Sequence, residues 1–262
     1  MFERIMKIFE RIRLIKIVAG YRKIPLHLIA VIFGAPNFLR PASTVDMRAN
    51  GLNFSNTVEV FIANLLPKHE LEDIRSLIGV AELELNNSED SNAREFPINW
   101  NSGFGLQVIL FVIIRLTKPS LYIETGTANG ASARSVCRAM SLNGFGKCIS
   151  IDIKDSSATL VKKEDRKFLE CVRTDGTTKN FLEIVENGKR LKPGFSIFMH
   201  DSDHSFFNQM SEYLAARNLK FNLLISDDID ASLAFSDFAA GNGIALFDER
   251  KIIGGVILNE SN

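Results

Sequence analysis

Four acidic side chains stand in two short clusters, each placed directly after an apolar run. Asp201 and Asp203 follow one run, and Asp227 and Asp228 follow the next. If the two runs are neighbouring parallel strands, their carboxyl ends meet at one edge of a sheet and the carboxylates gather there. Carboxylate oxygens are ligands that Mg²⁺ prefers in proteins. The spacing therefore predicts a shared cation site, and purely structural duty such as helix capping is the alternative.

A second candidate site lies earlier, where an apolar run ends in an acid and enters a glycine-spaced turn, ETGTANGAS over residues 124–132. Gly126 allows a positive φ, and Gly130 lets the backbone approach a ligand and the next helix approach the sheet. The glycine spacing departs from Gly-x-Gly-x-x-Gly, and the carboxylate of Glu124 would repel a pyrophosphate. The turn therefore favours a ligand that carries hydroxyls or a positive charge.

Asp152 ends the next apolar run, about one helix after the turn, which is the spacing of a β-α-β unit. A carboxylate at this place can accept hydrogen bonds from both hydroxyls of a ribose, and a solvated strand-end acid is the alternative. Three more apolar runs follow, ending near residues 174, 199 and 226, with helix-compatible segments between them. This alternation predicts a doubly wound α/β fold with ligand groups at the carboxyl ends of the strands.

Taken together, these motifs resemble the class I S-adenosylmethionine-dependent methyltransferases. The closest likeness is to the small-molecule O-methyltransferases, whose fourth strand ends in Asp-x-Asp-His-Ser-aromatic. The resemblance covers roughly residues 100–258, and its motifs are ETGTANGAS, Asp152, DSDHSF at 201–206 and SDDI at 226–229. Phe206 departs from the Tyr that is frequent in that branch, and Ala128 stands where many members have glycine.

The resemblance implies a fold and a set of ligand contacts. The fold is a Rossmann-like sheet of seven strands with an antiparallel last strand, closed by a hairpin of residues 244–247 and 251–258. S-adenosylmethionine is the implied cofactor, with Asp152 on its ribose and Asp175 on its adenine amino group, although an Asp-Gly pair is also a common turn. The residues implied to bind the cofactor are Glu124, Gly126, Thr127, Gly130, Ser132, Asp152 and Asp175.

A hydroxyl acceptor must lose its proton before or during methyl transfer, which requires a base or a metal. The resemblance places a divalent cation, Mg²⁺ by preference, on Asp201, Asp227 and Asp228, and makes His204 and Asp201 the catalytic groups. His200 is expected to be structural. The implied reaction is metal-assisted O-methylation of a small-molecule or glycan hydroxyl. A relative with other metal-dependent chemistry, a noncatalytic binding protein and an NAD(P)-dependent oxidoreductase are the alternatives.

The sequence divides into a helical N-terminal extension or cap, residues 1–95, and a Rossmann-like domain, residues 96–262. Trp100 is expected to anchor the core rather than to stack on a substrate. Within this frame we expect irregular chain over 36–56, helices over 58–66, 68–78 and 104–116, and a polar loop over 86–92.

Composition and charge limit the partners. The chain carries 31 basic and 31 acidic residues, which argues against a nucleic-acid partner. Three cysteines without metal-ligand spacing indicate reduced thiols and a cytoplasmic setting, and no transmembrane segment is expected. Residues 1–23 have the pattern of a basic amphipathic helix. Three roles are open for such a helix: packing on the domain, pairing with another subunit in a homo-oligomer, or lying peripherally on the anionic inner face of a membrane.

Overall fold

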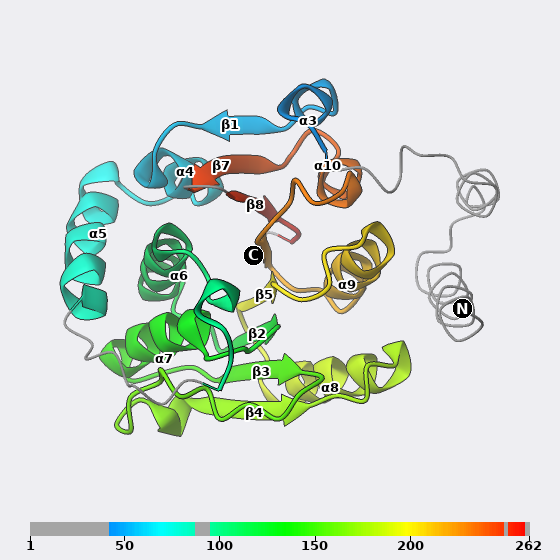
Figure 1. The fold of residues 1–262 in the computed structure, drawn as a ribbon. Coiled ribbons are helices and arrows are strands. Elements are labelled where there is room, and N and C mark those ends of the chain that lie inside the picture. The colour runs from blue at the N-terminus through cyan, green and yellow to red at the C-terminus, as the bar shows by residue number, and fades with distance from the viewer. Residues whose placement is uncertain (1–41, 87–94, 249–250, 260–262) are drawn as a thin grey trace.

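The computed structural model describes residues 42–86, 95–248 and 251–259 (Figure 1). The amphipathic segment 1–23, nearly all of the polar run 86–92 and the tip of the closing hairpin lie outside the described residues. No helix in the described part of the chain is long and apolar enough to cross a bilayer.

An eight-stranded sheet forms the centre of the molecule, in the order β1-β7-β8-β6-β5-β2-β3-β4. Neighbouring strands are parallel except where β8 pairs antiparallel with β6 and with β7. The doubly wound fold with an antiparallel last strand is therefore confirmed. The strands are β1 (Asn53–Ser55), β2 (Leu121–Thr125), β3 (Cys148–Asp152), β4 (Leu169–Arg173), β5 (Ser196–His200), β6 (Leu223–Ser226), β7 (Ile244–Asp248) and β8 (Lys251–Ile257).

Helices cover both faces of the sheet (Figure 1). One apolar cluster is built from residues of α4 to α7, and a second from residues of α3 and α8 to α10. The helices are α3 (Thr44–Ala49), α4 (Val58–Leu65), α5 (Leu71–Asn86), α6 (Phe104–Thr117), α7 (Ala131–Asn143), α8 (Thr178–Leu191), α9 (Phe206–Asn218) and α10 (Ala234–Ala239), with short 3₁₀ turns η2 (Ile98–Trp100) and η3 (Arg166–Phe168). Helix α6 is buried on all sides over residues 106–114, as expected for a helix without a polar face.

The eighth strand is one that the sequence did not predict. The expectation of irregular chain over 36–56 is wrong for its described part, because residues 44–49 form α3 and residues 53–55 pair with β7. A three-residue strand is too short for alternating polarity to be visible in the sequence. Helix α5 also begins later and runs longer than the predicted 68–78. The described extension thus adds an edge strand to the sheet and packs α4 and α5 beside α6.

Candidate active site

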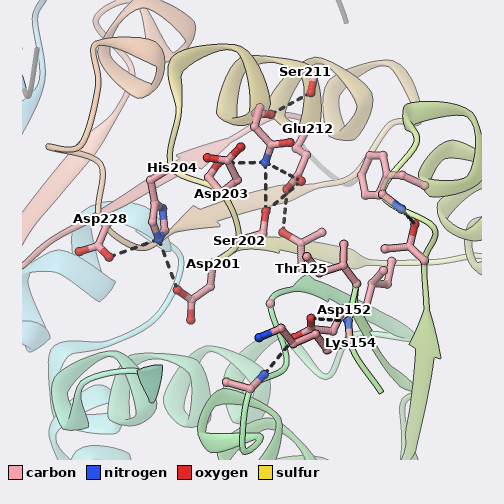
Figure 2. A pocket seen from close by; sticks show the side chains of 18 of the residues that line it. Thr125, Asp152, Lys154, Asp201, Ser202, Asp203, His204, Ser211, Glu212 and Asp228 are labelled. Atoms are coloured by element: carbon pink, nitrogen blue, oxygen red, sulfur yellow. Dashed lines mark hydrogen bonds and ion pairs between the residues drawn. The ribbon is translucent and has the colours of Figure 1, made fainter. Parts of the chain in front are cut away.

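A cavity of about 690 Å³ opens at the carboxyl ends of the parallel strands (Figure 2). It lies where β2 pairs with β3 on one side and with β5 on the other, so that the connections leave in opposite directions. Such a switch point leaves a crevice in doubly wound sheets, and the volume is in the usual range of roughly 300–1,000 Å³ for small-molecule sites. The cavity is therefore the candidate active site.

The turn after β2 forms one wall of the cavity, and its first glycine is required by the protein's own backbone. Gly126 has φ 89°, and a Cβ there would lie 1.8 Å from the carbonyl oxygen of Asp201. Gly130 has φ 80°, and a Cβ there would lie 2.6 Å from that of Ala158. Ala128 lines the cavity with φ 42°, in the left-handed region that glycine usually takes. Both glycines serve close backbone packing, and of the two only Gly126 lines the cavity.

Asp152 joins this turn to the end of β3. Its Oδ2 accepts hydrogen bonds from the amides of Thr127 at 2.9 Å and Ala128 at 3.2 Å, and its Oδ1 accepts one from the amide of Lys154 at 3.0 Å. Asp152 also lines the cavity, as the sequence predicted for a ligand-binding acid (Figure 2). Because an ionised carboxylate has about four acceptor sites, it retains capacity for a ligand.

Glu124 lies in a different place from the one the sequence implied. It is fully buried and does not line the cavity; its carboxylate accepts from the hydroxyls of Tyr122 at 2.9 Å and Ser150 at 2.6 Å. Burial raises the pKa of Glu124, although hydrogen bonds from Ser150 and Ser132 oppose this. The hydroxyl of Thr127 also bonds Ser150, at 2.8 Å. These side chains form a buried polar cluster beneath the turn, and Glu124 cannot face a cationic ligand from there.

Asp175 belongs to the turn that precedes α8. It is exposed, and its Oδ1 accepts from the amide of Thr177 at 2.7 Å. The hydrogen bonds from Thr177 hold the pKa of Asp175 below its usual value. Gly176, Thr177 and Thr178 line the cavity, whereas Asp175 does not. This arrangement favours the Asp-Gly turn over an adenine contact for that side chain.

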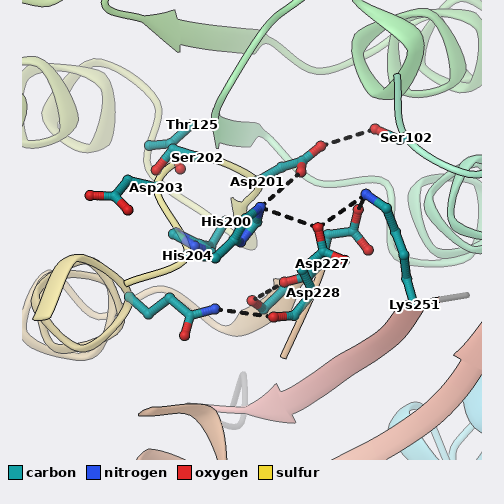
Figure 3. Close-up of polar contacts among 12 residues, drawn as sticks. Ser102, Thr125, His200, Asp201, Ser202, Asp203, His204, Asp227, Asp228 and Lys251 are labelled. Atoms are coloured by element: carbon teal, nitrogen blue, oxygen red, sulfur yellow. Dashed lines mark hydrogen bonds and ion pairs between the residues drawn. The ribbon is translucent and has the colours of Figure 1, made fainter. Parts of the chain in front are cut away.

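The strand-end acids do come together, and a lysine joins them (Figure 3). Lys251, the first residue of β8, places its Nζ 2.9 Å from Asp227 Oδ2 and 3.1 Å from Asp228 Oδ2. Asp201 accepts a hydrogen bond from Ser102 Oγ at 3.1 Å, and burial, followed by the charge of Asp227, raises its pKa well above the usual range. Sequence reasoning missed Lys251, although a lone lysine heading an apolar strand was a visible signal.

The predicted Mg²⁺ site on Asp201, Asp227 and Asp228 does not fit this arrangement. The Lys251 ammonium already lies within 3.1 Å of two of the three carboxylates, at the place that a metal ion would occupy. Asp227 is 1% exposed and does not line the cavity. Within the described ranges, no three His, Cys, Asp or Glu side chains are grouped so that they could hold a metal ion.

His204 lies beside these acids (Figure 3) and lines the cavity. Its Nε2 lies 3.3 Å from Asp228 Oδ2 and 4.0 Å from Asp201 Oδ1. Burial, followed by the neighbouring His200, lowers the pKa of His204 to about 4. The imidazole is therefore neutral near pH 7, and the negative charge of Asp228 acts in the opposite direction, towards the protonated form.

A buried polar network supports the loop after β5, and its centre, Glu212, was missed by sequence reasoning. The carboxylate binds Thr125 Oγ1 at 2.7 Å, His200 Nδ1 at 2.7 Å and Ser202 Oγ at 3.0 Å. Burial alone would raise the pKa of Glu212, but the charge and hydrogen bond of His200 and the hydroxyls outweigh it, so the pKa is lowered. His200 is thus part of the supporting structure. Only the tertiary fold brings α9 to the end of β5.

Replacing Glu212 with glutamine should destabilise the fold by roughly 3 kcal/mol, because the amide NH₂ would face buried donors. Because the pKa of Glu212 is lower in the folded protein than in the unfolded chain, its charge stabilises the native state at a pH above the unfolded pKa of about 4.3. This stabilisation is lost as the pH falls through the folded pKa. Urea unfolding between neutral and acidic pH should therefore show a shallower acid decline for Glu212→Gln than for the wild type. Glu183→Gln, in the exposed pair with Lys179, is the control and should change little. Equal losses in the two variants would contradict the prediction.

The expectation that Trp100 anchors the core is wrong. Trp100 is 49% exposed and lines the cavity, so it is not a core anchor. Its ring stacks on Phe96 with centroids 5.9 Å apart, and Lys154 Nζ lies 4.7 Å from its centroid. These contacts hold a large aromatic surface at the mouth of the site.

No protein-family model and no curated protein matches the sequence. Solved structures similar to this chain include an O-methyltransferase from Bacillus cereus in complex with SAH, with 13% identity over 76% of this chain and 96% of that chain, TM-score 0.44. The O-methyltransferase TomG from Streptomyces achromogenes, in complex with SAM, has 16% identity over 78% and 97%, TM-score 0.47. The SAH-bound methyltransferase PaMTH1 from Podospora anserina has 12% identity over 72% and 88%, TM-score 0.42. The fold of this chain is defined by its own strand order.

Proposed function

We propose that this chain is an S-adenosylmethionine-dependent methyltransferase that acts on a hydroxyl of a small molecule or glycan. One observation carries the proposal: a single cavity is lined both by the glycine turn with Asp152 and by Asp201, His204 and Asp228. The first group has the chemistry to hold a ribose-bearing ligand, and the second has the chemistry to take a proton from a hydroxyl. The family resemblance of these motifs in the sequence supplies the reaction class.

The charge of the cavity supports a cationic ligand. Its described lining has five acidic residues against two lysines, Lys154 and Lys251, and four of the acids remain if the raised pKa of Asp201 keeps that group protonated. Such an excess favours a ligand that carries a positive charge, such as a sulfonium or an ammonium group. The acidic members are Asp152, Asp201, Asp203, Glu212 and Asp228.

The residues of the chain would divide the work as follows. Asp152 accepts from ribose hydroxyls, with the turn at Gly126 and Ala128 beside it. When bound, S-adenosylmethionine supplies an electrophilic methyl group, which the acceptor oxygen takes while the electron pair of the broken C–S bond remains on sulfur. His204 takes the hydroxyl proton, and the negative charge of Asp228 stabilises the imidazolium. Orienting both reactants in one cavity is worth about 7–11 kcal/mol of the barrier.

The single tryptophan offers a direct test of the donor site. Because Trp100 is the only tryptophan and lines the cavity, all tryptophan emission reports on this place. Titration with S-adenosylhomocysteine should change that emission with a micromolar dissociation constant, and isothermal calorimetry should give the same value with and without Mg²⁺. NAD⁺ is the control ligand and should leave the emission unchanged. A folded protein that binds NAD⁺ but not S-adenosylhomocysteine would refute the proposed function.

A further inference from the structure

The unusual feature of the acceptor side of the cavity is a half-buried lysine that contacts two acids. Lys251 begins β8 and lines the cavity, and its side chain is 32% exposed. Its Nζ contacts Asp227 Oδ2 at 2.9 Å and Asp228 Oδ2 at 3.1 Å, and these two residues follow the last residue of β6 (Figure 3). A buried carboxylate such as that of Asp227, 1% exposed, is strongly destabilising without a partner, and Lys251 is that partner.

Local backbone geometry allows both acids to reach the same ammonium. Consecutive side chains of an extended strand point to opposite faces. Asp228 has φ 48°, in the left-handed region, so the chain turns directly after Asp227 and both carboxylates meet Lys251. The register of β8 against β6, which pairs Ser226 with Gly254, sets the start of β8 beside this turn. The cluster is therefore fixed by two strands and a strained turn.

We propose that Lys251 is the resident cation of the acceptor site and supplies the positive charge that a divalent metal would supply on these carboxylates. An ammonium has three donors; one hydrogen-bonds Asp227 Oδ2 at 2.9 Å, and Asp228 Oδ2 lies 3.1 Å from Nζ as an ion pair. A remaining donor would hydrogen-bond the acceptor oxygen, which gains negative charge as its proton passes to His204. Naming that oxygen rests on the proposed function, whereas the exclusion of a metal from this carboxylate cluster does not.

A divalent ion and this ammonium cannot share the cluster. An ion bound to Asp227 and Asp228 would stand within a few ångströms of Nζ, where like charges repel strongly in a partly buried site. Removing the ammonium leaves Asp227 and Asp228, two hard oxygen ligands that meet at the position of Nζ, with no cation between them. The proposal therefore makes an unusual prediction: deleting a positive side chain should create a metal site.

The experiment measures Mn²⁺ binding to the full chain by calorimetry and by electron paramagnetic resonance. The wild type should bind Mn²⁺ no tighter than millimolar, and Lys251→Met should bind it at least about tenfold tighter. Lys251→Arg, which retains the charge, should behave as the wild type. Lys147→Met, which removes a lysine paired with Glu170 at 3.2 Å outside the cavity, is the matched control and should gain nothing. Adding Asp227→Asn to Lys251→Met should abolish the gain.

The proposal is overturned if the wild type binds Mn²⁺ at micromolar concentration and Asp228→Asn removes that binding, or if folded Lys251→Met gains no binding. The wild-type arm stays decisive even if Lys251→Met does not fold. S-adenosylhomocysteine titration of the same samples separates the two ideas. Failure of that titration in the wild type counts against the proposed function, and the Mn²⁺ result still judges the role of Lys251.

Discussion

Replacing Gly126 with alanine should prevent stable folding, with a loss of more than about 4 kcal/mol. The added Cβ would stand 1.8 Å from the carbonyl oxygen of Asp201, at φ 89°, where an L-residue is already strained. Neither side can move cheaply. The Gly126 amide donates to the carbonyl of Ile151 at 2.8 Å, and the Asp201 amide donates to the carbonyl of Thr125 at 3.0 Å, so both backbones are held by the sheet.

Gly144→Ala is the matched control for this test. Gly144 caps α7 with φ 67° but has open space where a Cβ would be. It should lose only about 1–2 kcal/mol, the cost of the left-handed conformation alone. Soluble yield, circular dichroism and urea unfolding measure both variants. If Gly126→Ala unfolds at the same urea concentration as Gly144→Ala, the close approach of the turn to β5 is not a constraint on the fold.

Asp152→Ala should weaken S-adenosylhomocysteine binding roughly 10- to 100-fold, the worth of a hydrogen bond to a charged acceptor. The variant removes the acceptor for ribose hydroxyls and also frees the amides of Thr127 and Ala128. Asp152→Asn separates the two effects, because its remaining oxygen can still accept from the turn while the charge is lost. Trp100 emission and calorimetry report the dissociation constants.

The control for Asp152 is another acid close to it in the sequence. Asp155 is exposed and pairs with Arg173 at 2.9 Å, and it does not line the cavity of the candidate active site. Asp155→Ala should bind S-adenosylhomocysteine as the wild type does. If folded Asp152→Ala and Asp152→Asn also bind as the wild type does, the ribose role of Asp152 is wrong, whatever the reaction.

The strand-end positions were predictable from the sequence because they depend on short-range patterns. Apolar runs of strand length, each ending in a polar or acidic group and each separated by a helix, specify a parallel sheet with its ligand edge at the carboxyl ends. This predicted that Asp152, Asp201 and Asp228 gather at one edge of the sheet, where they line one cavity, whereas the antiparallel hairpin of β7 and β8 was implied by the family resemblance. Strand β1 was not predicted, because its three residues, 53–55, are too few to show an alternation of polar and apolar side chains.

Two properties of the site were decided by the tertiary structure alone. The first is how deep a side chain lies at the end of its strand. Glu124 and Asp152 share one face of the sheet, because Glu124 pairs with Ser150, two residues before Asp152. Glu124 is the penultimate residue of β2 and lies buried beneath the turn, whereas Asp152 is the last residue of β3 and lies on the cavity wall. The sequence named both acids but could not assign their depth.

The second is the arrival of partners from distant elements. Glu212 meets His200 from α9, and Lys251 meets Asp227 through the β6–β8 pairing. Pairing register and helix packing are settled by the whole core, so no local pattern contains them. The sequence by itself determined the sheet and the edge at which ligands bind. The tertiary structure decided which charges face each other there, because the electrostatic partner of a buried acid is set by through-space distance rather than by its neighbours in the chain.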